Sequence, residues 1–239
     1  MKSKIMFFLF SGLIFSISSI PLYVNSPLLY DLNLGVYVYE YGEEAELFDF
    51  YIMPSLLAYY HGLNPKIVEL DINIERGIPY WFLVMGDIVC LSDEPYYFQL
   101  DEIVETNLII KELKDCKTMI CLHPSRMEDF RELDGVIDII AVDPYPIAWN
   151  RSLSYVSEIL RKALKLFPNS DVWCVLQAWS SQTVRYPTET ELKTMISTAS
   201  QYTDTVIFWY FGLCPDSGYL GAYDNADFWN MFIGVLNGF

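Results

Sequence analysis

The fold class is best inferred from VIDIIAVDPYPIAWN, residues 136–150. Its first seven positions are almost all apolar, which is typical of a strand that is buried on both faces in a parallel sheet. The run ends at Asp143, which two prolines, Tyr145 and Trp149 follow. We therefore expect a buried strand whose carboxyl end delivers a carboxylate among aromatic rings.

This pattern recurs along the chain, where short apolar runs alternate with segments of helical spacing. Seven runs are predicted strands: residues 34–40, 48–54, 79–87, 117–124, 136–144, 171–179 and 205–212. An eighth run within residues 63–76 is compatible with a helix or a strand. The predicted helices of the better-defined part are residues 100–115, 125–135, 152–168, 187–202 and 225–239. Two features define them further: a capping box formed by Thr188 and Glu191, and an apolar face of Ile103, Val104, Leu108, Ile109 and Leu113.

Alternation of buried strands with helices predicts the α/β class, with a parallel sheet covered by helices. A closed (β/α)8 barrel needs roughly 200 residues, and about 214 remain after the N-terminal segment. The fold class that we predict is a (β/α)8 TIM-like barrel, small or incomplete. An open doubly wound sheet is the alternative, but the sequence has no GxGxxG or GxxxxGK motif, which excludes its Rossmann and P-loop versions.

The N-terminus has the pattern of a secretory signal. Lys2 and Lys4 precede a 16-residue apolar run, shorter than the roughly 20 residues of a membrane-spanning helix. A clear cleavage site is missing, so residues 1–25 are interpreted as a signal peptide, an uncleaved membrane anchor or a buried helix. The first two alternatives predict a protein that is secreted or anchored to the outer face of a membrane, touching the bilayer only through this segment. Residues 26–239 are then a single barrel domain.

Charge and cysteine content limit the partners and the chemistry. The formal net charge is −16, and no basic stripe follows the sequence, so nucleic acid is not an expected partner. The five cysteines lack CxxC spacing. Cys121 and Cys174 fall in predicted strands and should be buried thiols, whereas Cys90, Cys116 and Cys214 fall in predicted loops, where one disulfide among them is an open alternative.

In a barrel, functional residues lie at the carboxyl ends of the strands. Those ends supply three candidate catalytic carboxylates, Glu40, Asp87 and Asp143. They also supply candidate substrate-binding residues: His123, Tyr145, Gln177, Trp179, Trp209 and Tyr210. Aromatic faces stack on sugar rings, and carboxylates and amides bind hydroxyl groups, so this composition points to carbohydrate as the partner.

Each candidate also has a purely structural interpretation. Asp143 before Pro144 and Asp87 after Gly86 are compatible with local turn hydrogen bonds. Glu40 opens an acidic run, and His123 is compatible with a structural hydrogen bond. The Gln177 amide needs a partner, either a ligand or the backbone, because an unpaired buried amide costs roughly 1–3 kcal/mol. Of the adjacent Trp209 and Tyr210, one should face the barrel interior and the other the helices.

Four segments carry a resemblance to a known group of proteins: IDIIAVDPYPI (137–147), VWCVLQAWSS (172–181), RYPTETEL (185–192) and VIFWYFG (206–212). In that order they are similar to a strand ending in Asp-x-Tyr-Pro, a strand ending in Gln-Ala-aromatic, an Arg-x-Pro-Thr helix start and an aromatic last strand. This set, within residues 117–215, resembles secreted TIM-barrel glycoside-hydrolase-like proteins. The best-known branch of these enzymes carries a glutamate after the fourth strand and another on the seventh, and here the corresponding ends, CLHPSR and FWYFGL, contain none.

The resemblance implies a glycoside hydrolase that cleaves O-glycosidic bonds with a pair of carboxylates at the barrel mouth, drawn from Asp143, Asp87 and Glu40. The alternative is a carbohydrate-binding or surface-interaction barrel without catalysis. A serine hydrolase is disfavoured because no GxSxG motif occurs, and a metal hydrolase because only two histidines exist, far apart. We therefore expect neither a metal nor another cofactor.

Overall fold

The computed structural model describes residues 33–37, 50–54, 67–69, 86–209 and 220–238. Eight parallel strands follow one another in chain order and close into a barrel, because β1 pairs with both β2 and β8. The strands are β1 (Asn33–Tyr37), β2 (Phe50–Pro54), β3 (Ile67–Glu69), β4 (Ile88–Asp93), β5 (Lys117–Leu122), β6 (Ile139–Val142), β7 (Asp171–Gln177) and β8 (Thr205–Trp209). This confirms the small TIM-like barrel, and the closed sheet excludes the doubly wound alternative.

One predicted strand was misplaced. The run 79–87 was predicted to end at Asp87, but β4 begins at Ile88, directly after it. Gly86 has a φ of 65°, a left-handed conformation that suits the turn before a strand. The run IVCLS that follows is as apolar as the predicted strand, so sequence alone favoured the earlier segment. The ambiguous run at residues 63–76 contains strand β3.

Alternate side chains of each strand face two different surroundings. In β6, Ile140 and Val142 join the core between the strands and the helices, whereas Ile139 and Ala141 join the core inside the barrel. This burial on both sides explains the uninterrupted apolar runs of the sequence. The alternation directs Asp143, the residue after β6, toward the inside of the barrel mouth.

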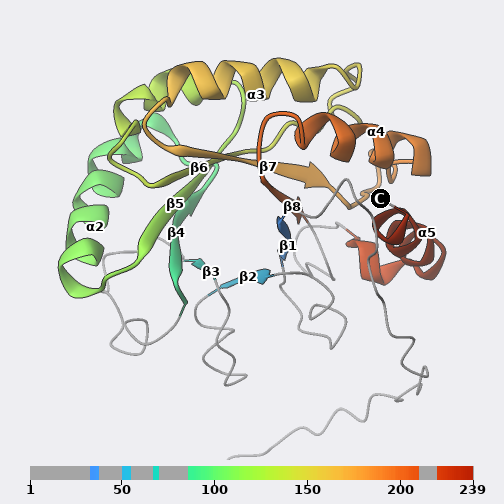
Figure 1. Ribbon diagram of the computed structural model, residues 1–239, viewed down its shortest axis with the longest axis horizontal. Helices are drawn as coiled ribbons and strands as arrows, with labels where there is room; N and C mark the ends of the chain where they lie inside the picture. Colours follow the sequence, from blue (N-terminus) through green and yellow to red (C-terminus); the bar gives the residue numbers. More distant parts are fainter. Residues whose placement is uncertain (1–32, 38–49, 55–66, 70–85, 210–219, 239) are drawn as a thin grey trace, which may run out of the picture.

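In the described part of the chain, four helices cover the strands in chain order (Figure 1): α2 (Leu100–Leu113), α3 (Tyr155–Leu166), α4 (Glu189–Ala199) and α5 (Ala226–Asn237). Short 3-10 helices are η4 (Tyr97–Gln99), η5 (Met127–Leu133) and η6 (Ala222–Asp224). The predicted capping box of α4 is confirmed: Glu191 N donates to Thr188 Oγ1 at 3.3 Å, and Thr188 N donates to Glu191 Oε2 at 2.7 Å.

Two helix predictions need correction. Segment 125–135 forms the 3-10 helix η5, because its buried residues Met127, Phe130 and Leu133 recur every three positions, the period of that helix. The inward face of α2 is also rotated from the predicted one: Ile103 is buried, but Leu108 and Leu113 are 60% and 51% exposed. The buried residues of α2 are Leu100, Ile103, Thr106, Asn107 and Ile110.

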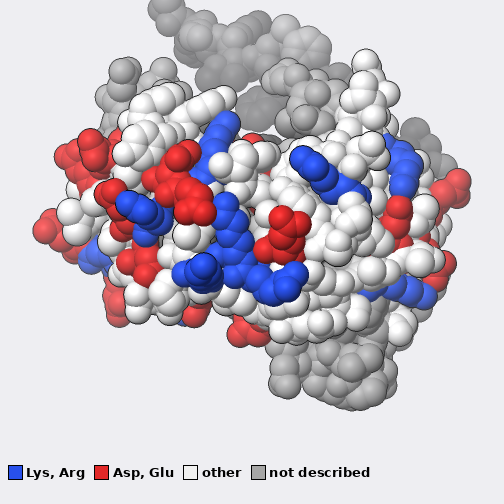
Figure 2. Space-filling model, turned by 90° about the horizontal axis from the view of Figure 1, so that it is seen from above, with Lys and Arg blue, Asp and Glu red and all other residues white. Residues whose placement is uncertain are grey.

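Charges of both signs lie interspersed on the face around α3 (Figure 2). Two ion pairs on the outer helical layer illustrate this mixture: Lys162 with Glu128 at 3.2 Å, and Lys193 with Glu189 at 2.7 Å. Exposed pairs of this kind contribute little to stability. This face therefore has a mixed, solvated surface.

In the described part of the chain, Cys116, Cys121 and Cys174 form no disulfide, and the thiol of Cys90 donates to the carbonyl of Ser92 at 3.6 Å. Cys121 and Cys174 are buried as predicted. The prediction that Cys90 lies in a loop was wrong: Cys90 is buried in β4, inside the barrel. Cys214 and residues 1–25 lie outside the described residues. Within the described ranges, no helix has the length and apolar character needed to cross a bilayer.

Candidate active site

The carboxylate predicted at the end of β6 lies at the barrel mouth. Asp143 is buried, with 1% of its surface exposed, and its Oδ1 has no hydrogen-bond partner among the described residues. The strand register places it next to His123, because Val142 pairs with Leu122 one position earlier. A buried, incompletely satisfied carboxyl group is costly for a fold and is therefore a candidate for function.

Two further acidic residues, which are not among the candidates expected from the sequence, lie at the carboxyl end of β4: Asp93 is its last residue and Glu94 follows it. The strand register shifts between Cys90, which pairs with Met119, and Asp93, which pairs with Cys121, so that β4 carries an extra residue there. Such bulges redirect side chains at barrel rims. The next residue, Glu94, has a φ of 46°, which is uncommon for any residue other than glycine. Its N–H donates to the carbonyl of Cys121 at 2.9 Å, which anchors this turn to β5.

The bulge and the turn bring three carboxyl groups together. The pKa of Asp143 is raised well above its ordinary value, first by burial, then by a hydrogen bond with the Glu94 side chain and by the charges of Glu94 and Asp93. The pKa of Asp93 is raised to about 6 by burial and by the charge of Glu94, while a hydrogen bond with the Cys121 side chain acts in the opposite direction. Asp93 and Asp143 thus both hold a proton more tightly than an ordinary carboxyl group within one site.

Aromatic rings line the same mouth. Tyr145 stacks on Trp209 with ring centroids 6.3 Å apart and planes 28° from parallel, and it meets Trp179 edge-on at 5.8 Å. Trp179 also meets Trp209 edge-on at 5.8 Å, and Trp149 lies 5.6 Å from Tyr145. Tyr145, Trp179 and Trp209 therefore group as predicted, and Trp149 joins them. Burial and the neighbouring acidic groups raise the pKa of Tyr145, which keeps its hydroxyl neutral.

His123 lies between the carboxyl groups and the rings. Its Nδ1 accepts a hydrogen bond from the backbone N–H of Ser125 at 3.2 Å, and the Ser125 hydroxyl lies 2.7 Å from the same atom. Because a backbone N–H can only donate, Nδ1 is unprotonated and the ring proton is on Nε2. Burial lowers the pKa of His123, against the opposing charge of Glu94. The ring contacts Trp149 at a centroid distance of 4.7 Å. Because the lowered pKa favours the neutral ring, His123 offers its Nε2–H as a donor at this site.

Of the two expected partners for Gln177, a ligand or the backbone, the structure shows the backbone. Its Nε2 donates to the carbonyls of Trp179 and Arg185 at 2.9 and 3.2 Å, and its Oε1 accepts from the N–H of Ala148 at 3.1 Å. Both amide hydrogens are therefore engaged. Gln177 ties the loop after β6 to the loop after β7, and in this way it holds the segments that carry Trp149 and Trp179.

Asp87, the remaining candidate among the described residues, does not join this cluster. Asp87 is exposed immediately before β4, where its carbonyl accepts from Lys117 N at 3.1 Å. Since this is the amino end of both strands, the structure places Asp87 at the end of the barrel opposite to Asp143, contrary to the prediction. Glu40 and Tyr210 lie outside the described residues.

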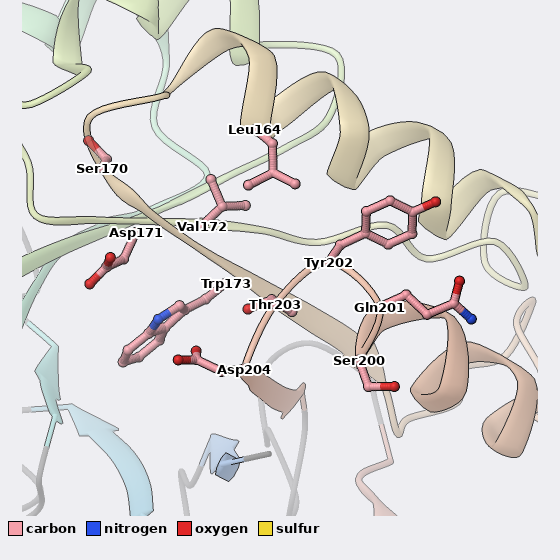
Figure 3. A pocket seen from close by; sticks show the side chains of 10 residues that line it. All are labelled: Leu164, Ser170, Asp171, Val172, Trp173, Ser200, Gln201, Tyr202, Thr203 and Asp204. Atoms are coloured by element: carbon pink, nitrogen blue, oxygen red, sulfur yellow. The ribbon is translucent and has the colours of Figure 1, made fainter. Parts of the chain in front are cut away.

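A hollow of about 580 Å³ lies at that opposite end, before β7 and β8 (Figure 3). Several of its polar groups are already paired: Asp171 with Lys117 at 3.1 Å, and Asp204 with the hydroxyl of Thr205 at 2.9 Å. The amino end of a barrel contributes mainly to stability. We therefore locate the candidate active site at the carboxyl end. No group of three or more metal-binding side chains is arranged to hold an ion in the described part of the chain.

Comparison with known proteins identifies the fold but not the family. No protein-family model matches the chain, and no curated protein matches it in sequence. Its structure is similar to a GH10 xylanase from Thermobacillus composti, with a TM-score of 0.57 and 14% identity over 87% of this chain and 98% of the xylanase. It is also similar to a glycoside hydrolase family 17 beta-1,3-glucanosyltransferase from Rhizomucor miehei, with a TM-score of 0.54 and 8% identity over 80% and 92% of the two chains.

The PgaB glycoside hydrolase domain from Bordetella bronchiseptica matches with a TM-score of 0.37 and 9% identity, over 47% of this chain and 38% of that domain. The chain thus spans less than half of that relative. At these identities the likeness shows the fold alone, a TIM-type barrel of the kind found in glycoside hydrolases.

Proposed function

We propose that this protein is a glycoside hydrolase that cleaves O-glycosidic bonds at the carboxyl mouth of its barrel. The observation that carries the proposal is the convergence of Asp93, Glu94 and Asp143, whose carboxyl groups interact although they lie at the ends of two different strands. Glycoside hydrolysis needs one protonated carboxyl group and one ionised carboxylate beside it. The raised pKa of Asp93 meets the first need, and Glu94 supplies a second carboxyl group beside it.

In this proposal Asp93 is the proton donor. It is half-buried, and its pKa of about 6 leaves about a tenth of the Asp93 carboxyl groups protonated at pH 7 and about half at pH 6, far more than an ordinary aspartate retains. The Asp93 proton passes to the glycosidic oxygen as the bond from that oxygen to the anomeric carbon breaks. Glu94 supplies the second carboxylate, which attacks the anomeric carbon or activates the water that does so.

Asp143 is assigned a different role from the catalytic one expected from the sequence. It is too buried to reach a substrate, and it retains its proton, so its hydroxyl donates a hydrogen bond to the Glu94 carboxylate. Asp143 is therefore a positioning residue that orients Glu94. The half-buried rings of Trp149 and Trp209 provide apolar surface for a sugar beside these carboxyl groups, and the buried Tyr145 ring packs against both.

A hydrolysis screen of the purified protein tests the proposal. Wild-type protein and the Glu94→Gln variant are incubated with a broad panel of polysaccharides and aryl glycosides, and released reducing ends are measured. Turnover by the wild type and its loss in the variant are expected. If the wild type hydrolyses no substrate but still binds glycans, the non-catalytic carbohydrate-binding barrel is the correct function.

The location of the protein is also part of the proposal. The basic residues and apolar run within residues 1–25 motivate export, after which the barrel works outside the cytoplasm. Fractionation of cells that express the full chain, with intact-mass measurement of the exported product, tests this. A full-length protein that stays in the cytoplasmic fraction would contradict it.

A further inference from the structure

Three consecutive aromatic residues are exposed at the rim of the mouth, directly after the catalytic turn. Tyr96, Tyr97 and Phe98 have 57%, 59% and 81% of their surfaces exposed. They follow the carboxyl end of β4 and precede α2, so they lie on the same face as the carboxyl cluster. Large apolar side chains gathered in this way on a surface mark a binding site.

The rings have a defined arrangement. Tyr96 and Phe98 are stacked with their centroids 5.6 Å apart and their planes 8° from parallel. The guanidinium of Arg126 lies 4.2 Å from the centroid of Tyr96, and the Tyr96 N–H donates to Gln99 Oε1 at 2.8 Å. Since Tyr96 contacts both Arg126 and Phe98, the highly exposed Phe98 ring offers the larger free surface.

The same arginine connects these rings to the carboxyl cluster. Arg126 Nη1 donates to the carbonyl of Glu94 at 2.7 Å and to that of Pro95 at 3.0 Å. The guanidinium therefore holds both the backbone of the catalytic turn and the ring of Tyr96. A ligand on Phe98 lies at a fixed position relative to Glu94.

We propose that Phe98, supported by Tyr96, is a stacking platform for a sugar unit that lies beyond the cleaved bond, so that the substrate is an extended neutral polysaccharide. This inference rests on the proposed function, because it takes the carboxyl cluster as the place of cleavage. Rings stack on the apolar face of a sugar, and a platform outside the catalytic turn contributes only when the chain is long enough to reach it.

Charge favours a neutral glycan over other occupants. The exposed residues Asp101 and Glu102 open α2 right after the platform, and the protein carries a net charge of −16. These carboxylates repel acidic polysaccharides and anionic membranes, but they accept hydrogen bonds from sugar hydroxyls. Continuity with the carboxyl cluster through Arg126 makes a glycan chain a better occupant than a partner protein.

The test compares ligands of two lengths. Binding of xylohexaose and laminarihexaose, and of the matching disaccharides, is measured by calorimetry on Glu94→Gln protein to prevent turnover. Adding Phe98→Ala should weaken binding of a hexasaccharide about tenfold, which corresponds to one lost stacking contact, and leave the disaccharide within about twofold. Leu113→Ala is the matched control, because Leu113 is also an exposed apolar residue but ends α2, far from the rim.

Three outcomes overturn the platform: hexasaccharides that bind no more tightly than disaccharides, equal losses for both lengths, or a Phe98→Ala variant that changes only self-association or vesicle binding. Failure of the proposed function is recognised separately. If Phe98→Ala abolishes length-dependent binding and the wild-type protein shows no turnover, the platform is supported and the hydrolase is rejected.

Discussion

Glu94 and Asp143 share a hydrogen bond between their carboxyl groups, although they follow β4 and β6, strands that β5 separates. The contact depends on the extra residue in β4 and on the left-handed turn at Glu94, which together direct acidic side chains from the rim of β4 toward the end of β6. Two carboxyl groups in such contact cannot both be ionised at low cost. The pair therefore retains a proton, which the buried Asp143 holds.

Glu94→Gln and Asp93→Asn should each reduce kcat on an aryl glycoside by about 10²–10⁴-fold, because each removes a group that acts on the reacting atoms. Both changes keep the size of the side chain. The measurement is steady-state kinetics, with the melting temperature recorded to confirm folding. Asp87→Asn is the control, since Asp87 lies at the other end of the barrel; a variant of Asp87 as inactive as that of Glu94 would refute this site.

Asp143 offers a sharper test, because a protonated carboxyl group and an amide both donate hydrogen bonds. Asp143→Asn should keep kcat within about tenfold of the wild type, since the amide still donates to Glu94. Asp143→Leu, of similar size but without a donor, should lower kcat by about 10²-fold or more. The measurement is steady-state kinetics of both Asp143 variants on the same glycoside. Complete loss of activity in the asparagine variant would show that Asp143 acts as an ionised catalytic group.

The raised pKa of Asp93 predicts a pH-dependent stability. Its ordinary value is 3.8 and its folded value about 6, so the folded state holds this proton more tightly than the unfolded state. The contribution is fully present below pH 4 and is lost as the pH rises through about 6. The raised pKa of Asp143 acts in the same direction.

Melting temperatures of the wild type, Asp93→Asn and the Asp87→Asn control should therefore be compared between pH 4 and pH 7. The gain in stability of Asp93→Asn relative to the wild type should increase over this range, whereas that of the control stays constant. A difference that is constant or decreases with pH would contradict the raised pKa.

Most of the barrel was predictable because burial on both sheet faces leaves continuous apolar runs, as in β5, β6 and β7. The prediction failed where two apolar runs adjoin. Residues 79–94 contain PYWFLVM and IVCLS on either side of Gly86 and Asp87, and hydropathy does not determine which run is the strand. Because the predicted strand ended too early, Asp87 was selected as a candidate catalytic carboxylate, and Asp93 and Glu94 were missed.

The site was partly predictable for a related reason. Asp143, Tyr145 and Trp209 were identified because they end regular strands, where one residue per strand faces the mouth. The contribution of β4 depends on a bulge and a left-handed residue, which the periodicity of the sequence does not reveal. A signal was present in LSDEP (91–95), an apolar run that ends in acidic residues before a proline, as AVDP (141–144) does.

Gln177 should be important for stability rather than for chemistry. Gln177→Leu removes the partners of the Ala148 N–H and of the Trp179 and Arg185 carbonyls, and each buried unpaired group costs roughly 1–3 kcal/mol. The free energy of unfolding should fall by about 3 kcal/mol, as chemical denaturation measures. Gln182→Leu is the matched control, because Gln182 is exposed in the loop after β7. Equal stabilities of the two variants would show that the Gln177 contacts are dispensable.

Arg126 should act on catalysis only through the position of Glu94. Arg126→Ala removes the hydrogen bonds to the Glu94 and Pro95 carbonyls and the contact with Tyr96, so the catalytic turn loses its support. A displacement of about 1 Å at a reacting group can cost 10²-fold in rate. On a small aryl glycoside, which does not reach Phe98, kcat should fall between about 10- and 100-fold while KM changes little.

Arg126→Lys keeps the charge but lacks the planar group that reaches both carbonyls and stacks on the ring, so it should recover only part of the lost rate. Arg131→Ala, at an exposed position of η5, is the control for removing a positive charge from the same segment and should retain wild-type kinetics. Steady-state kinetics of the three variants, with melting temperatures to exclude unfolding, provide the measurement. An Arg126→Ala variant that raises KM at constant kcat would show that Arg126 binds the substrate instead of positioning Glu94.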